Sequence, residues 1–170
     1  MSIEMVRENL SRSRELHHQL AAAGYTNGCV EVSLTALGAM INPSSVSPER
    51  QLRDLQECVN EAGFQVNWMV SADHEIAGED ISALFGGVIP LEEQAGEGEV
   101  LGYLWSEHYP DAPAHVMAIL QEDTDSYVLV DSDNPLGQMH VHAREIAHLS
   151  NYVTTHGGQF GIYQIKQKSG

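Results

Sequence analysis

The sequence predicts an α+β fold, in which helices come first and a mostly antiparallel sheet follows. Apolar residues recur at helical spacing up to Gly63, and beyond it they alternate with polar residues as they do in strands. Two apolar runs, 115–120 and 127–130, are joined by a short polar turn of the kind that connects hairpins. The absence of sustained strand–helix–strand alternation favours α+β over α/β. With no repeat or linker in the sequence, we expect residues 1–170 to form one domain.

Three helices are expected in the N-terminal part of the chain. Residues 3–23 carry apolar side chains at helical spacing among charged ones and end near a glycine. Residues 29–41 are apolar on almost every side, which is typical of a buried central helix, and they stop at an Asn-Pro pair. Residues 47–63 begin with a serine and a proline, which favour the N-cap and the first helical position, and they close at a glycine.

The rest of the chain is expected to supply the sheet. Strands are predicted over 64–70, 87–91, 100–105, 115–120, 127–130, 139–141 and 160–165. A short helix near 80–85 and a longer helix over 143–155 interrupt these strands, and a pair of glycines ends the longer helix. Consecutive strands are expected to pair mainly as antiparallel neighbours.

The composition is that of a soluble globular protein and argues against several classes of partner. The chain has 24 acidic and 8 basic side chains, for a formal net charge of −16. This charge repels phosphate backbones and anionic lipids, so neither a nucleic-acid nor a membrane partner is expected, whereas a cationic protein partner would be favoured. The first ten residues are amphipathic and charged, unlike a Sec signal peptide. We therefore expect a cytoplasmic protein, with export by a signal-free secretion system as the alternative.

Cys29 is the candidate nucleophile. It follows Gly28 and opens the apolar helix expected over 29–41, so it meets the positive end of the helix dipole, which favours a thiolate. The competing interpretation is an ordinary buried cysteine. The second cysteine, Cys58, lies near the apolar face of the third helix and is assigned to the core. Two cysteines make no disulfide framework, so reduced thiols are expected.

His115 and Asp131 are predicted neighbours. His115 opens one strand of the expected hairpin and Asp131 follows the other, and in an antiparallel pair the start of one strand lies beside the end of the next. A carboxylate in that place would fix the imidazole tautomer and favour the charged imidazolium. Asp133 and Asn134, which follow in the same loop, are the alternatives for this role.

These residues, in this order, resemble the papain-like cysteine peptidases. The resemblance rests on a glycine and cysteine opening a buried helix, a histidine opening a strand, and a later strand ending in aspartate. The matching stretches here are 27–29, 115–120 and 130–137. They look most like the small bacterial peptidases that clip bacteriocin leader peptides, and the order is similar to that of Josephin deubiquitinases and bacterial effector deamidases. The likeness runs loosely from about residue 15 to 165 and implies a papain-like fold with a Cys-His-Asp triad.

The resemblance breaks at the oxyanion hole. These families usually carry a glutamine five or six residues before the cysteine, whereas Ala23 and Gly24 stand there in this chain. Gln19 is too far back by spacing unless the turn bends differently. Asn27, two residues before Cys29, is the candidate side-chain donor, and the backbone N–H of Cys29 is the second.

Two further patterns have alternative interpretations. His140 and His142 alternate in a predicted strand and would share a face, but no Cys-x-x-Cys or nearby carboxylate pair completes a metal site, so no metal or other cofactor is expected. Trp105 is assigned to the core, with a wall of the substrate cleft as the alternative.

The expected activity is that of a thiol hydrolase, in which Cys29 attacks a carbonyl, His115 moves the proton and Asp131 orients His115. The first-ranked reaction is cleavage of a peptide or isopeptide bond in a protein or peptide substrate. Protein glutamine deamidation is second and peptidoglycan amide cleavage third, while transglutamination would pass through the same acyl-enzyme. The rival class is a binding module that has the fold without catalysis.

Overall fold

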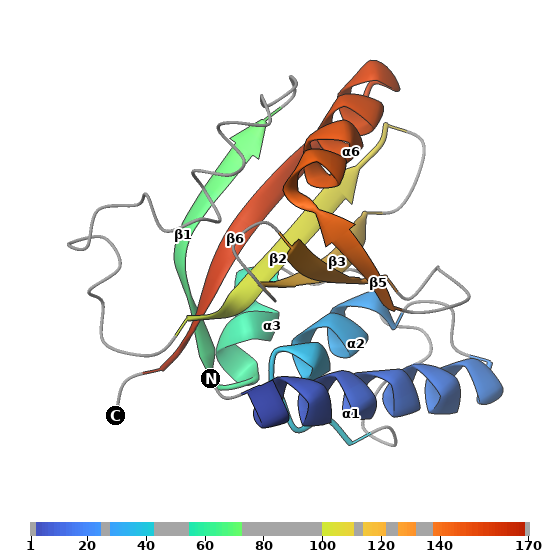
Figure 1. Cartoon of the computed structure of the whole chain (residues 1–170), viewed down its shortest axis with the longest axis vertical. Helices are drawn as coiled ribbons and strands as arrows, with labels where there is room; N and C mark the ends of the chain where they lie inside the picture. The colour runs from blue at the N-terminus through green and yellow to red at the C-terminus, as the bar shows by residue number, and fades with distance from the viewer. Residues whose placement is uncertain are drawn as a thin grey trace.

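The structure is a computed structural model that describes residues 3–24, 28–42, 55–72, 100–110, 114–121, 126–131 and 138–168. Within these residues it is an α+β protein of four helices and a six-stranded antiparallel sheet, as the sequence predicts (Figure 1). The helices are α1 (Ile3–Ala22), α2 (Cys29–Ala36), α3 (Leu55–Glu61) and α6 (Ala143–Thr155). The strands are β1 (Phe64–Ala72), β2 (Val100–His108), β3 (His115–Gln121), β4 (Ser126–Val130), β5 (Gln138–His142) and β6 (Gln159–Gln167).

Several sequence expectations lie outside the described residues. They concern the start of the third helix over 47–54, the short helix near 80–85 and the strand over 87–91. Among the residues that are described, no helix is long and apolar enough to cross a membrane.

The strands lie in the order β1-β6-β2-β3-β4-β5, and every neighbouring pair is antiparallel. The strands β2 to β5 follow one another across the sheet as they do along the chain. In contrast, β6 is inserted between β1 and β2, as Figure 1 shows in orange-red between green and yellow. The expected hairpin of 115–120 and 127–130 is confirmed, with Ala118 opposite Val130 in its register.

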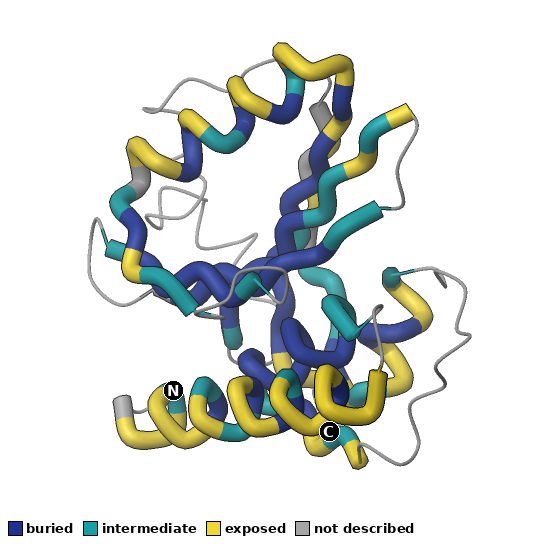
Figure 2. Tube along the Cα trace, turned by 90° about the vertical axis from the view of Figure 1, so that its right-hand side faces the viewer, coloured by how far each residue is buried: buried dark blue, intermediate teal, exposed yellow. Residues whose placement is uncertain are grey.

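The sheet separates two apolar cores. On one face, α1, α2 and α3 pack against side chains that include Val116, Ala118 and Leu120 of β3. On the other face, α6 packs against a cluster that includes Met117 and Ile119 of the same strand, as alternation in a strand requires. Figure 2 shows the buried sheet between α6 above and α1 below, with the outer side of α1 exposed.

α2 is the most deeply placed helix, and it is shorter than the sequence predicts. Its residues from Glu31 to Ala36 are all buried. The helix ends at Ala36 and not near residue 41, because Gly38 takes a φ of +113° and turns the chain away. The N–H of Gly38 then donates to Thr35 O at 3.0 Å and that of Ala39 to Leu34 O at 3.0 Å. These two bonds form a Schellman motif, which satisfies the last carbonyls of the helix.

Candidate active site

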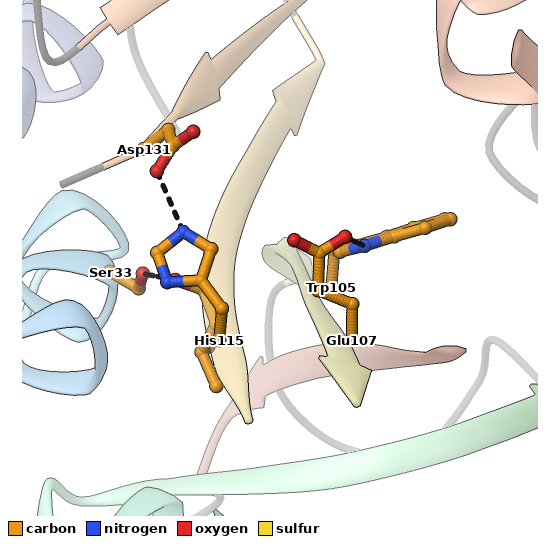
Figure 3. A network of polar contacts seen from close by, with 6 residues as sticks. Ser33, Trp105, Glu107, His115 and Asp131 are labelled. Atoms are coloured by element: carbon orange, nitrogen blue, oxygen red, sulfur yellow. Dashed lines mark hydrogen bonds and ion pairs between the residues drawn. The ribbon is translucent and has the colours of Figure 1, made fainter. Parts of the chain in front are cut away.

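His115 and Asp131 are hydrogen-bonded neighbours, which confirms the proximity expected from the hairpin. His115 Nε2 lies 2.7 Å from Asp131 Oδ1, and the two side chains are 17% and 22% exposed (Figure 3). His115 is the first residue of β3, and Asp131 directly follows the last residue of β4. Because β3 and β4 pair in antiparallel register, the start of one and the end of the other lie at the same edge of the sheet.

Cys29 completes the cluster from the other side of His115. It is half-buried at the first position of α2, directly after the N-cap residue Gly28. The second ring nitrogen of His115 points toward α2 in Figure 3, and the imidazole hydrogen-bonds the Cys29 side chain. The structure thus brings together three of the four predicted site residues.

These contacts determine the charge of His115. Burial on its own lowers the pKa of this imidazole. The hydrogen bonds to Asp131 and Cys29, together with Coulombic interactions with both residues, outweigh burial and raise the pKa of His115 from 6.5 to about 10. The ring is therefore an imidazolium at neutral pH, placed between a carboxylate and a sulfur.

The start of α2 also supplies hydrogen-bond donors near Cys29. The N–H of Val32 is the one that closes the first helical turn, donating to Gly28 O at 2.9 Å. The N–H groups of Cys29 and Val30 precede it in the first turn, where an α-helix has no internal acceptor for them. The backbone N–H of Cys29 is therefore suitably placed at the helix terminus to stabilise negative charge beside the sulfur.

The side-chain donor expected for an oxyanion hole is not located. Asn27 lies outside the described residues, as do Asp133 and Asn134, the alternatives to Asp131. Gln19 is exposed on α1, where its Nε2 donates to Glu15 Oε1 at 3.4 Å. The structure therefore does not bring Gln19 to Cys29.

Two buried serines hold α2 in place, and the sequence reasoning missed both. Ser13 of α1 donates from Oγ to Val32 O at 2.8 Å, and Ser33 of α2 donates from Oγ to Val116 O at 3.3 Å. For Ser33 the available signal was a polar residue in a largely apolar helix, since a buried hydroxyl needs a hydrogen-bond partner. Ser13 stands among the charged residues of α1, where the sequence does not mark it.

Trp105 and Cys58 belong to the core. Trp105 is fully buried and stacks on Phe160, with ring centroids 4.6 Å apart and planes 4° apart. Its Nε1 donates to Glu107 Oε2 at 3.3 Å. The alternative that Trp105 lines an open cleft is therefore wrong, because no part of the ring reaches solvent. Cys58 is buried in α3 within the core on the other face, as expected.

His142 has a structural role that the metal hypothesis did not anticipate. It is the N-cap of α6, where its Nδ1 accepts from Arg144 N at 3.2 Å and its own N–H donates to Glu145 Oε1 at 3.4 Å. A glutamate three residues after a capping residue was the sequence signal for this box. His140 is exposed, and the described part of the chain contains no group of three or more side chains arranged to hold a metal ion.

No protein-family model matches the chain, and no curated protein matches it in sequence.

Proposed function

We propose that the protein is a papain-like thiol hydrolase that cleaves a peptide or isopeptide bond of a protein substrate. The observation that carries the proposal is the position of His115, which bonds Asp131 at 2.7 Å and also bonds Cys29 at the start of a buried helix. A nucleophile, a base and an orienting carboxylate in hydrogen-bonded sequence form the arrangement that covalent acyl transfer requires.

The reaction follows from the charges of the three residues. The Cys29 thiolate attacks the carbonyl carbon, forming a C–S bond and a tetrahedral oxyanion. The imidazolium of His115 gives its proton to the departing amine as the C–N bond breaks, which leaves an acyl-enzyme and a neutral imidazole. Water then attacks the thioester while neutral His115 takes its proton, and collapse breaks the C–S bond, which releases the carboxylic acid and restores the Cys29 thiolate beside the His115 imidazolium. Asp131 keeps the ring oriented through both steps.

The oxyanion would be stabilised by the start of α2. The backbone N–H of Cys29 is the first donor, and the positive end of the helix dipole adds to it. Asn27 is our candidate for the second donor, in place of the glutamine that papain-like enzymes usually provide. The net charge of −16 favours protein substrates that carry a net positive charge.

Alkylation of the folded protein tests the proposal. The protein is exposed to limiting iodoacetamide between pH 5 and 8, and the modified cysteines are read by mass spectrometry. We expect rapid modification of Cys29 well below the pKa of a free thiol, about 8.5, and slow modification of buried Cys58. His115→Ala should slow the reaction of Cys29. Equal reactivity of the two cysteines, or no reaction at Cys29, would contradict the proposal and favour a binding module.

The outcome of the acyl-enzyme is tested on a peptide library derived from a whole proteome. Hydrolysis of peptide bonds yields shorter fragments, whereas glutamine deamidation changes the mass of peptides that remain intact. Cys29→Ala protein serves as the control, since it keeps the fold and loses the nucleophile. Deamidated but uncleaved peptides would assign the site to deamidation.

A further inference from the structure

Ser33 links the two elements that carry Cys29 and His115. It lies four residues after Cys29 in α2, and its Oγ donates to the backbone carbonyl of Val116, the residue after His115, at 3.3 Å. We infer that Ser33 is a positioning residue that sets the separation between the Cys29 sulfur and the His115 ring. The inference rests on the proposed function, because it concerns how the two reacting side chains are held at the separation that the reaction needs.

The position of this bond makes it effective. Residues four apart in a helix lie on one side of it, about one turn of 5.4 Å apart, so Ser33 and Cys29 face β3 together. Val116 is the residue next to His115, and Figure 3 shows the Ser33 bond beside the His115 ring. One contact therefore fixes helix to strand within a turn of the nucleophile and within a residue of the base.

The bond reaches β3 at a residue that is also paired within the sheet. Val116 pairs with Ser106 of β2. Among the described residues, the register between β3 and β4 runs from Ala118 to Gln121. The contact with α2 thus joins the helix to a paired residue of β3. The bond is longer than the usual O–H···O range of about 2.5–3.0 Å, so we expect its loss to have only a small effect on the free energy of unfolding.

Ser13 provides a matched control. Ser13 and Ser33 are 0% and 1% exposed, and each donates from Oγ to a backbone carbonyl that anchors α2. Ser13, however, bonds Val32 from α1, whereas Ser33 bonds Val116 in the strand of His115. Removal of either hydroxyl takes one hydrogen bond from α2, but of the two only the Ser33 bond joins α2 to β3.

The test compares Ser33→Ala with Ser13→Ala in the full chain. The rate of Cys29 alkylation by iodoacetamide is measured as a function of pH, and the urea midpoint of each variant is measured alongside. We expect Ser33→Ala to slow the alkylation of Cys29 about 10- to 100-fold near neutral pH, because the sulfur and the imidazole are no longer held in the reactive geometry. The pH profile of the rate should also shift toward that of a free thiol. Ser33→Thr keeps the hydroxyl and should restore most of the rate.

The control variant determines how the result is interpreted. Ser13→Ala should lower the urea midpoint at least as much and leave the pH profile in place. If Ser33→Ala leaves the profile unchanged, or if both serine variants shift it equally, the positioning role is overturned. Failure of the proposed function has a different signature, because wild-type Cys29 would then react no faster than Cys58, and the positioning role would fall with it.

Discussion

At the scale of single residues, His115 determines how the site responds to pH. Its hydrogen bonds and Coulombic interactions with Asp131 and Cys29 raise its pKa to about 10 against the opposing effect of burial. A pKa raised by folding means that the protonated ring stabilises the folded state. This stabilisation is complete below the unfolded pKa of about 6.5 and is lost as the pH rises through about 10.

Asp131→Asn tests this balance. The substitution keeps a polar side chain of the same size and removes the negative charge 2.7 Å from His115 Nε2. We expect the pKa of His115 to fall from about 10 toward 6.5, as measured by NMR titration of histidine Cε1–H signals. His115→Gln identifies the signal to follow.

The same variant also alters the pH dependence of stability. Wild type should exceed Asp131→Asn by about 1–3 kcal/mol in free energy of unfolding near pH 6.5, since a hydrogen bond between charged groups is lost. The difference should shrink as the pH approaches 10, where the wild-type ring also loses its proton. A pKa unchanged by the substitution, or a stability difference that grows with pH, would show that Asp131 does not act on His115.

At the scale of elements, the position of α2 depends on its fit against α1. Gly28 precedes Cys29 with a φ of −89°, which any residue adopts, so the glycine is not required by the backbone. The constraint is steric, because a Cβ at Gly28 would lie 2.8 Å from Leu20 Cδ1. Leu20 is itself buried in the core beneath α2 and has little room to move.

Gly28→Ala should therefore displace the start of α2. We expect a loss of about 1–3 kcal/mol in free energy of unfolding from overpacking, and slower alkylation of Cys29. Leu20→Val removes the opposing atom, so the double variant should recover part of both losses. Urea titration and alkylation of the two single variants and the double variant form a double-mutant cycle. If the stability losses of the two single variants simply add in the double variant, the effect of Gly28→Ala does not act through Leu20.

Some bounds of the helices and strands could be predicted from the sequence, and others could not. The bounds of α6 and the β3–β4 hairpin follow from local signals, namely glycines after a helix and a polar turn between apolar runs. The end of α2 was missed, because its apolar pattern continues past Gly38, where only the left-handed backbone shows that the helix has stopped. Strand β2 also extends to His108, beyond the apolar run that predicted it.

At the scale of the whole molecule, one sheet supports two cores. Leu37 is fully buried on the face covered by α1, α2 and α3, and Ile162 is fully buried on the face covered by α6. Both cores share the strands between them, and β2 and β6 contribute side chains to each. Loss of packing on either face should thus weaken the same cooperative unit.

Leu37→Ala and Ile162→Ala test this coupling. Each should cost about 2–5 kcal/mol and lower the midpoint of a single urea transition followed by both circular dichroism and tryptophan fluorescence. Alkylation of buried Cys58 should accelerate in both variants, because its thiol reacts when the protein opens. The partly exposed Val100→Ala is the control, expected to change stability by less than about 0.5 kcal/mol. Separate transitions for the two variants would show that the cores unfold independently.

In the candidate site too, a contact between neighbouring strands was predictable from the sequence, whereas contacts between distant parts of the chain were not. The His115–Asp131 contact was predictable because a hairpin places its own ends together. The contact of His115 with Cys29 joins distant parts of the chain, and no periodicity encodes it. Only the resemblance in residue order anticipated that contact. The anchoring of α2 by Ser13 and Ser33 depends on packing, which a sequence pattern does not specify.

The insertion of β6 between β1 and β2 has a consequence during protein synthesis. A ribosome makes β1 and β2 well before β6, yet neither of these strands pairs with the other. Until residues 159–167 emerge, β1 has no sheet partner among the described strands, and the edge of β2 that β6 will cover is open beside β3. Such edges promote association between nascent chains. The protein should therefore be most vulnerable to aggregation in the interval before its last strand is made.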